Sequence, residues 1–136
     1  MAIKPENTFI SGVHKHIPRH IHREKMNNPY SSGTADVWYS GKGGDLWVEY
    51  KWIPRIPQRG VVAPQKLLSA LQMKWLNDRY NEGRNVNVII GCPAGGVLLL
   101  DRLWECDLTA AGFTSLIRSR HDLADWISSQ CDTPLS

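Results

Sequence analysis

Two carboxylates and a lysine, Asp36, Glu49 and Lys51, have the types and the spacing that metal-assisted chemistry needs. Two carboxylates held side by side repel each other unless a proton or a cation lies between them. Mg²⁺ takes oxygen ligands, usually one or two carboxylates together with waters and phosphate oxygens. A lysine beside such a pair can orient a nucleophilic water or stabilise charge that develops on a scissile phosphate. These three residues therefore predict half of a metal site that acts on a phosphate ester.

A β-hairpin must bring these residues together. Enrichment in Val, Trp and Tyr predicts strands over residues 35–40 and 45–52, with a glycine-rich turn between them. A four-residue turn sets Asp36 opposite Glu49, with Cβ atoms roughly 4.5–5.5 Å apart. The alternative is an exposed ladder of cross-strand charges, and a slip of one residue in the turn would separate the carboxylates. Strand alternation places the apolar residues on one face of the hairpin and five others on the opposite face: Asp36, Trp38, Trp47, Glu49 and Lys51.

The sequence around these residues resembles the PD-(D/E)xK nuclease superfamily, in which an acid precedes a strand that bears E-x-K. Residues 32–36, S-G-T-A-D, look like the glycine-led acidic motif of the small virus-type replication and repair nuclease (VRR-NUC) modules. Residues 68–72 with the W-L pair at 75–76 and Gly83 resemble the helix that follows in those modules. The proline that precedes their aspartate is Ala35 here. The resemblance implies an α/β fold, a restriction-endonuclease-like mixed β-sheet flanked by helices with an α-β-β-β-α-β type core.

The same resemblance implies a deoxyribonuclease that depends on Mg²⁺ or Mn²⁺, hydrolyses phosphodiester bonds and leaves a 5′ phosphate. The implied metal ligands are Asp36, Glu49 and the Tyr50 carbonyl, and Lys51 would assist the attacking water. Branched or junction DNA is the target that the resemblance favours. The alternatives are a site-specific homing or restriction-like endonuclease and, from another class, a noncatalytic nucleic-acid-binding module.

Two further residues would complete the catalytic set by the same resemblance, Glu6 on the first helix and Gln72 on a later one. Each has a structural alternative. Glu6 would lie in the first turn of a helix, where a negative charge is favourable. Gln72 stands three residues after Ser69 and could close a capping box with it.

Basic residues concentrate in the half of the chain that contains the motif. The net charge is +3, and residues 1–66 hold ten Lys and Arg against five Asp and Glu. A positive surface beside an acidic pair suits DNA, because phosphates supply most nonspecific affinity. We expect a phosphate-binding arm at residues 14–25 and a DNA-contacting loop at 53–66, with these contact residues: Lys15, Arg19, Arg23, Lys25, Arg55, Arg59 and Lys66.

Each of these basic segments has an alternative reading. Both could be solvated segments without function. The two H-x-H pairs of the arm could also form a zinc site, but no cysteine lies nearby and the interleaved lysines and arginines would repel the ion.

Composition predicts one domain over residues 1–136, with 42% hydrophobic residues and enough length for a core. No apolar run is long enough to span a bilayer, so no membrane partner is expected, and the N-terminal segment lacks a signal peptide. We therefore expect the cytoplasm, that of the host cell for a viral or phage source. The three cysteines show no paired spacing and are expected to be reduced.

The remaining pattern predicts helices over residues 5–16, 69–83 and 121–131, buried strands over 86–91 and 96–100, and an edge strand over 114–118. We also expect a homodimer, because one Asp-Glu-Lys set cuts one strand and a twofold axis would supply a second site. Six tryptophans are many for one small core, so some are expected in an apolar patch that a partner covers. The alternative is that they pack inside.

Overall fold

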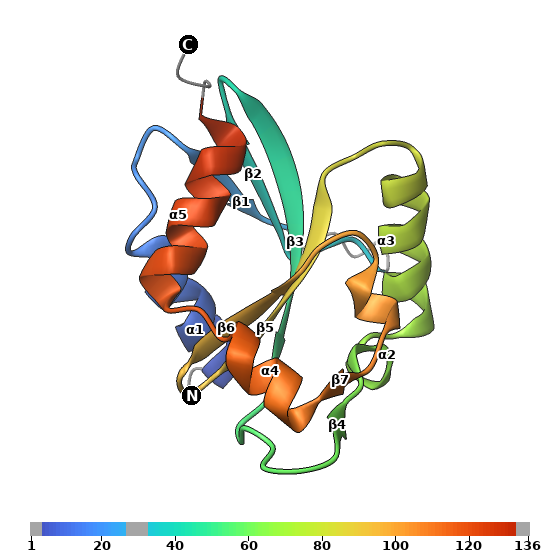
Figure 1. Ribbon diagram of the computed structural model, residues 1–136. Helices are drawn as coiled ribbons and strands as arrows, with labels where there is room; N and C mark the ends of the chain where they lie inside the picture. Colours follow the sequence, from blue (N-terminus) through green and yellow to red (C-terminus); the bar gives the residue numbers. More distant parts are fainter. Residues whose placement is uncertain (1–3, 27–32, 133–136) are drawn as a thin grey trace.

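A mixed five-stranded sheet forms the centre of the molecule, in the strand order β1-β2-β3-β5-β6 (Figure 1). The computed structural model describes residues 4–26 and 33–132. β3 and β5 run parallel, and the other neighbours run antiparallel. The strands are β1 (His22–Lys25), β2 (Val37–Gly41), β3 (Gly44–Trp52), β5 (Val86–Cys92) and β6 (Gly95–Leu99).

Helices cover both faces of this sheet. α1 (Pro5–His14) and α5 (Arg120–Cys131) lie on one face, and α3 (Ala70–Asn81) lies on the other (Figure 1). None of the helices in the described part of the chain is long and apolar enough to cross a membrane. The smaller elements are β4 (Val61–Val62), α2 (Pro64–Leu67), the 3-10 helix η1 (Leu103–Glu105), β7 (Leu108–Thr109) and α4 (Ala110–Leu116).

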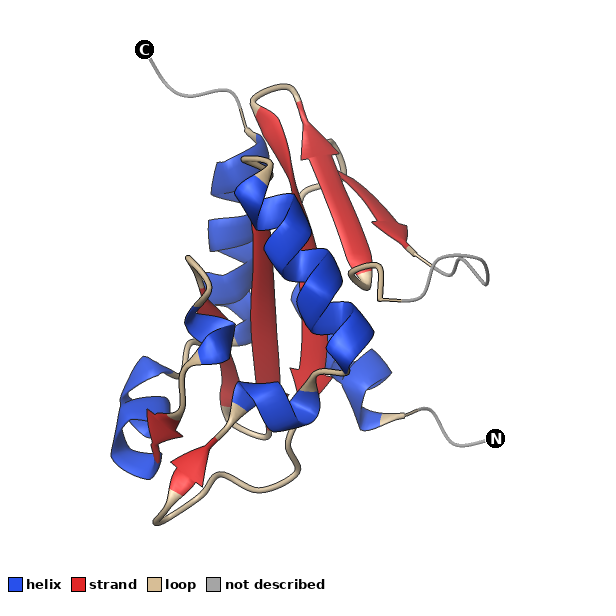
Figure 2. Ribbon diagram, turned by 90° about the vertical axis from the view of Figure 1, so that its right-hand side faces the viewer, coloured by secondary structure: helices blue, strands red, loops and turns tan. Residues whose placement is uncertain are grey.

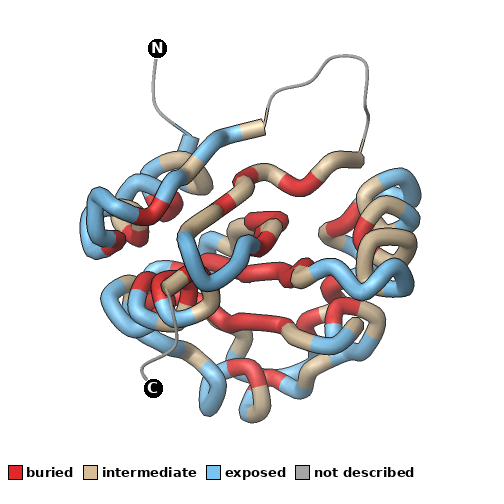
Figure 3. Tube along the Cα trace, turned by 90° about the horizontal axis from the view of Figure 1, so that it is seen from above, coloured by how far each residue is buried: buried red, intermediate tan, exposed pale blue. Residues whose placement is uncertain are grey.

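Each face of the sheet has its own apolar core, so buried residues concentrate in the central strands and on the inner sides of the helices (Figure 3). All seven residues of β5 are buried, as expected for a strand covered on both sides. Along β3, Leu46, Val48 and Tyr50 belong to the core beneath α1 and α5, while Trp47 packs against the core beneath α3. The predicted alternation of faces is therefore confirmed.

The hairpin has the register that the turn length predicts. Ser40 pairs with Asp45, Trp38 with Trp47 and Val37 with Val48. The ladder ends at Val37, so Asp36 enters the sheet through a bend rather than as a strand residue. The predicted Asp36–Glu49 pair is therefore not part of the ladder, but the Asp36 carboxylate still reaches β3, where the Tyr50 N–H donates to it.

α1 lies close to the sheet because two glycines make room for it. A Cβ on Gly91 or Gly96 would come within 2.7 or 2.9 Å of the Phe9 ring, so Phe9 rests directly on β5 and β6. The Phe9 ring also meets Tyr50 edge-on, with ring centroids 6.1 Å apart. This packing brings the first turn of α1, with Glu6, to the end of β3.

Three predicted elements differ from the structure. Residues 22–25 of the expected arm pair with β2 as edge strand β1 and supply the third strand of the implied core. The edge strand predicted at 114–118 is wrong: Thr109 caps α4 by accepting from Gly112 N–H, the helix continues to Leu116, and Arg118 alone bridges to Gly96. The loop at 53–66 contains β4, which pairs with β7, and α2. The three cysteines are free, as expected.

Candidate active site

Backbone contacts on two sides fix the position of Asp36. Its Oδ2 accepts a hydrogen bond from the Tyr50 N–H at 2.8 Å, which ties the carboxylate to β3. Gly33 has a φ of +90°, and a Cβ there would lie 2.4 Å from the Leu71 carbonyl oxygen. Only glycine fits such an approach, so the glycine-led motif packs against the start of α3 and leads straight into Asp36. Ser32, the first residue of that motif, lies outside the described residues.

Glu49 is buried beside Asp36 and Lys51. Its side chain is 1% exposed, and neither carboxylate oxygen has a hydrogen-bond partner among the described residues. Lys51 Nζ lies 3.4 Å from Glu49 Oε2 and forms an ion pair with it. Burial, and then the charge of Asp36, raises the pKa of Glu49 to about 8, although Lys51 opposes the rise. Burying such a group is costly, so the pair requires a proton or a cation.

Asp36 and Glu6 belong to the same charged cluster. Burial raises the pKa of Asp36, and the Tyr50 N–H, Lys51, the Glu49 carboxyl and Lys25 limit the rise. Burial and then the negative charge of Asp36 raise the pKa of Glu6, against the charges of Lys51 and Lys25. The structure therefore brings Glu6, from the first turn of α1, close to the hairpin carboxylates.

The Tyr50 carbonyl faces the side of the strand on which Asp36 lies. Trp47 N–H donates to the Asn85 carbonyl at 2.9 Å, on the β5 side of the strand. The direction of the backbone groups alternates along a strand, and the N–H and C=O of one residue point the same way. Both groups of Tyr50 therefore point away from β5, and its N–H is the one that reaches Asp36.

These donors fit a hard divalent cation. Two carboxylates, one on β3 and one directly before β2, with a backbone carbonyl beside them, are the oxygen ligands that Mg²⁺ and Mn²⁺ prefer. The buried Glu49 oxygens, which lack hydrogen-bond partners within the described chain, are the specific observation that an ion would explain. The residues that would hold it are Asp36, Glu49 and the Tyr50 carbonyl.

Gln72 is engaged in a capping box at the start of α3. Its Oε1 accepts from the Ser69 N–H at 2.9 Å, and its own N–H donates to Ser69 Oγ at 3.1 Å. The capping alternative is the one that the structure shows. A role of Gln72 beside the carboxylates stays a prediction.

The predicted basic arm divides into exposed and engaged residues. Lys15 and Arg19 are exposed. Arg23 instead donates to the His14 carbonyl oxygen at 2.7 Å, and Lys25 donates to Asn7 Oδ1 at 2.8 Å. The charge of Lys25 also acts on Glu6 and Asp36, so this lysine lies beside the carboxylates.

The basic residues after β3 lie on the surface of the irregular segment. Arg55, Arg59 and Lys66 are all exposed. Arg55 and Lys66 line an apolar pocket of about 270 Å³ together with Val62 and Leu67. DNA contact by these three residues stays a prediction.

A buried chain of hydrogen bonds behind the site was missed by sequence reasoning. His14 Nε2 lies 2.7 Å from Tyr39 Oη, which lies 2.6 Å from Tyr50 Oη. His14 was assigned to the basic arm, but burial, and then the charges of Arg23 and Lys25, lowers its pKa to about 4. The signal available in the sequence was the placement of both tyrosines on the apolar face of the hairpin.

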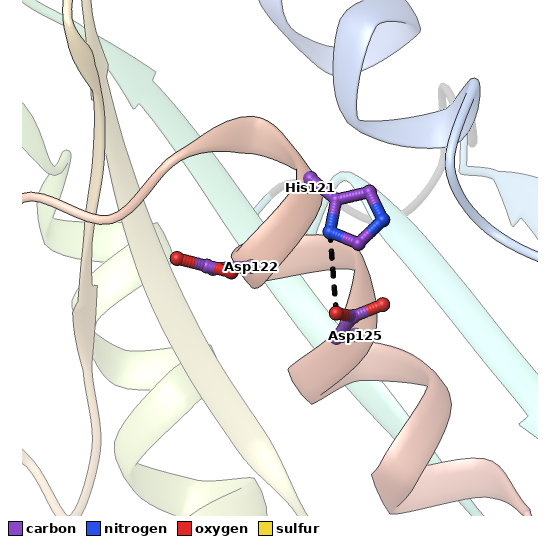
Figure 4. A group of neighbouring side chains, drawn as sticks. All are labelled: His121, Asp122 and Asp125. Atoms are coloured by element: carbon purple, nitrogen blue, oxygen red, sulfur yellow. Dashed lines mark ion pairs between the residues drawn. The ribbon is translucent and has the colours of Figure 1, made fainter.

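A second group of potential ligands lies on the surface at the start of α5, where His121, Asp122 and Asp125 are all exposed. His121 Nδ1 and Asp125 Oδ2 form an ion pair at 3.3 Å, one helical turn apart. One ligand atom of each residue lies within 4.8 Å of the other two, and Figure 4 marks an ion pair between His121 and Asp125 alone. Ser119 Oγ accepts from the Asp122 N–H and caps the helix. These contacts account for the group as ordinary helix-end chemistry.

Comparison with known proteins identifies the fold. No protein-family model matches the chain, and no curated protein matches it significantly. Among solved structures, the chain is similar to the 1.6 Å resolution structure of Archaeoglobus fulgidus Hjc, a Holliday junction resolvase from an archaeal hyperthermophile. The TM-score is 0.53 at 13% sequence identity, over 90% of this chain and 97% of the resolvase chain. The predicted restriction-endonuclease-like fold, a mixed sheet flanked by helices, is thereby confirmed.

Proposed function

We propose that this protein is a divalent-metal-dependent endonuclease that cuts branched or junction DNA. The observation that carries the proposal is Glu49, a buried carboxylate that has no hydrogen-bond partner in the described part of the chain and lies beside Asp36 and Lys51. The E-x-K arrangement on a restriction-endonuclease-like fold supports nuclease chemistry. Assignment to the VRR-NUC branch rests on the sequence motifs alone.

Each residue of the cluster has a distinct task in this proposal. Asp36 and Glu49 hold Mg²⁺ or Mn²⁺, which supplies Lewis-acid stabilisation of the negative charge on the phosphate when bound. The Tyr50 N–H keeps Asp36 aimed at the cluster. Lys51 donates a hydrogen bond to the attacking water or to the scissile phosphate, where an ammonium is most effective in a partly buried site. Glu6 completes the acidic set from α1.

The similarity to a Holliday junction resolvase favours a branched target over linear duplex. Exposed Lys15 and Arg19 would contact phosphates without reading sequence, which suits recognition of DNA shape. A homodimer would place two such sites on the two strands of a junction. Light scattering during size-exclusion chromatography tests this part: twice the mass of one chain is expected, and a monomer that remains monomeric on DNA would contradict it.

The deciding experiment is a cleavage panel. Purified protein is incubated with a four-way junction, a flap, a single strand and a linear duplex, with Mg²⁺ or Mn²⁺ and with EDTA as the control. We expect metal-dependent cleavage that is fastest on the branched substrates. Glu49→Gln is the matched variant, because it keeps the side-chain volume and removes the charge.

Two results would contradict the proposal. Binding of DNA without cleavage of any substrate would indicate a noncatalytic nucleic-acid-binding module. Unimpaired cleavage by Glu49→Gln would mean that the chemistry lies elsewhere in the molecule.

A further inference from the structure

A continuous row of aromatic side chains lies on the same face of the hairpin as the carboxylates. His22 of β1, Trp38 of β2, Trp47 of β3 and Trp75 of α3 contact one another in that order. The ring centroids are 5.5, 5.9 and 5.4 Å apart along the row. The Arg79 guanidinium lies 5.6 Å from the Trp75 ring centroid and closes the row on α3.

This aromatic row is the direct neighbour of the proposed cutting site. Trp47 precedes Glu49 by two residues in β3, so both side chains lie on one face of that strand, and Trp38 of β2 lies two residues after Asp36. Two residues of a strand span about 7 Å. The register confirms that the two tryptophans also face each other across the hairpin. A DNA strand that reaches the carboxylates from the side of the hairpin turn would therefore pass beside the indoles.

The row is accessible to solvent. Trp38, Trp47 and Trp75 are each partly exposed, whereas Trp104 is fully buried. In Figure 2, which looks onto the α3 side, β1 and β2 lie beside α3, and β3 passes behind it. The His22 side chain is 55% exposed and meets Trp38 edge-on, so the row is open at its β1 end. Cross-strand packing stabilises the hairpin, but it does not require three partly exposed indoles in succession.

The charges around the row favour bases over phosphates. Asp45 Oδ2 accepts from Trp38 Nε1 at 2.9 Å, and Glu24 Oε1 lies 3.7 Å from His22 Nε2. These two carboxylates disfavour a phosphate backbone at the β1–β2 end of the row, and Arg79 at the other end is already paired with Glu82 at 2.7 Å. A nucleobase is neutral and offers a π-face to any aromatic ring. The hydrogen bond from Trp38 to Asp45 also fixes the orientation of the indole, so little side-chain freedom is lost when a base binds.

We propose that the aromatic row is a stacking site for unpaired nucleobases at the branch point of the DNA that the carboxylates cut. The inference rests on the proposed nuclease function and names what that site recognises. A branch point exposes bases that a regular duplex keeps stacked on one another. Because every base has a π-face, such a site selects for unpaired structure and tolerates any sequence.

The test compares two labelled strands of equal length by fluorescence anisotropy in EDTA. One strand carries thymine at every position, and the other is abasic throughout but has the same phosphates. We expect the protein to bind the thymine strand about tenfold more tightly. Trp38→Leu should abolish that preference, and Trp38→Phe should retain it. Trp126→Leu is the matched control, since Trp126 is a partly buried tryptophan of α5 that packs on the opposite face.

Equal affinity of the unaltered protein for the two strands would overturn the stacking site. So would an unchanged preference in a folded Trp38→Leu protein. If Trp38→Leu does not fold, quenching of tryptophan fluorescence in the unaltered protein decides instead: the thymine strand should quench, and equal quenching by the abasic strand would overturn the proposal.

Junction cleavage measured in parallel separates this inference from the proposed function. Tighter binding of the thymine strand without junction cleavage would support the stacking site and contradict the proposed nuclease activity. Cleavage without base preference leaves the nuclease in place and removes the stacking site. Absence of both removes both.

Discussion

Glu49 and Tyr50 are neighbours in β3 that point to opposite faces of the sheet, and their polar groups have opposite surroundings. The Tyr50 hydroxyl belongs to a chain of hydrogen bonds with Tyr39 and His14. Burial raises the pKa of both tyrosines and lowers that of His14 to about 4, so the three groups are neutral near pH 7. Glu49 is equally buried, yet no described residue hydrogen-bonds its oxygens.

The two clusters differ in whether their polar groups have hydrogen-bond partners, not in how far they are buried. A buried polar group with its partners in place stabilises one arrangement of the core. A buried carboxylate that accepts no hydrogen bond, held beside a second carboxylate, favours a bound proton or cation. The first cluster therefore stabilises the core, and the second is the one that we propose binds a metal ion.

The largest expected effect that tests this comparison is on cleavage. Asp36→Asn and Glu49→Gln should each lower the cleavage rate by about 10³-fold or more, because each removes a metal ligand's charge and keeps its volume. DNA binding should persist or tighten, since a negative charge beside the phosphates is gone. Tyr39→Phe should leave the rate nearly unchanged. Single-turnover cleavage of a junction with Mg²⁺ measures all three, and a comparable loss in Tyr39→Phe would show that the two clusters act as one.

The second-largest expected effect is on the free energy of unfolding, which should depend on pH when no metal is bound. Folded Glu49 keeps its proton up to about pH 8, whereas its ordinary pKa of 4.5 applies to the unfolded chain. Between these values the native state binds the extra proton, so its contribution to the free energy of unfolding falls by about 1.4 kcal/mol per pH unit as pH rises. Urea unfolding in EDTA from pH 5 to pH 9 measures the slope. Glu49→Gln should remove this slope. The same dependence of the free energy of unfolding on pH in both proteins would contradict the raised pKa of Glu49.

The contribution of His14 to stability should rise with pH, whereas that of Glu49 should fall. The pKa of His14 is lowered from 6.5 to about 4, so its contribution to stability is complete above pH 6.5 and is lost as pH falls toward 4. Tyr39→Phe should lower the free energy of unfolding by about 1–3 kcal/mol, because His14 and Tyr50 both lose their partner. Tyr80→Phe, on a partly buried tyrosine of α3, is the control. Full stability of Tyr39→Phe would mean that the hydrogen-bonded chain is dispensable.

The smallest effect concerns exposed residues outside both clusters. Lys15→Ala and Arg19→Ala should each weaken binding to every DNA sequence and reduce the salt slope by about one. Stability and the cleavage rate at saturating DNA should not change. Arg23 is left intact because it donates to the His14 carbonyl oxygen. Unaltered salt slopes in both variants would return residues 14–25 to a solvated segment without function.

Local rules were enough to predict the hairpin and the face on which its carboxylates lie. The four-residue turn sets the register, and a period of two then assigns each side chain to a face. The same rules failed for residues 22–25, where alternating charged side chains hide an edge strand that only pairing with β2 creates. They also failed for residues 114–118, where a Thr109 cap and packing of Phe113 in the core favour helix.

The sequence by itself determined the hairpin, its register and the face of β3 on which Glu49 and Lys51 lie. Only the tertiary structure decided which buried polar groups are satisfied. It turned His14 from a basic-arm residue into a neutral partner of Tyr39, engaged Gln72 in a helix cap and brought Glu6 to the hairpin. The reason is that hydrogen-bond partners and desolvation come from segments distant in sequence, here α1, β2 and β3, whereas periodicity and turn length report only on near neighbours.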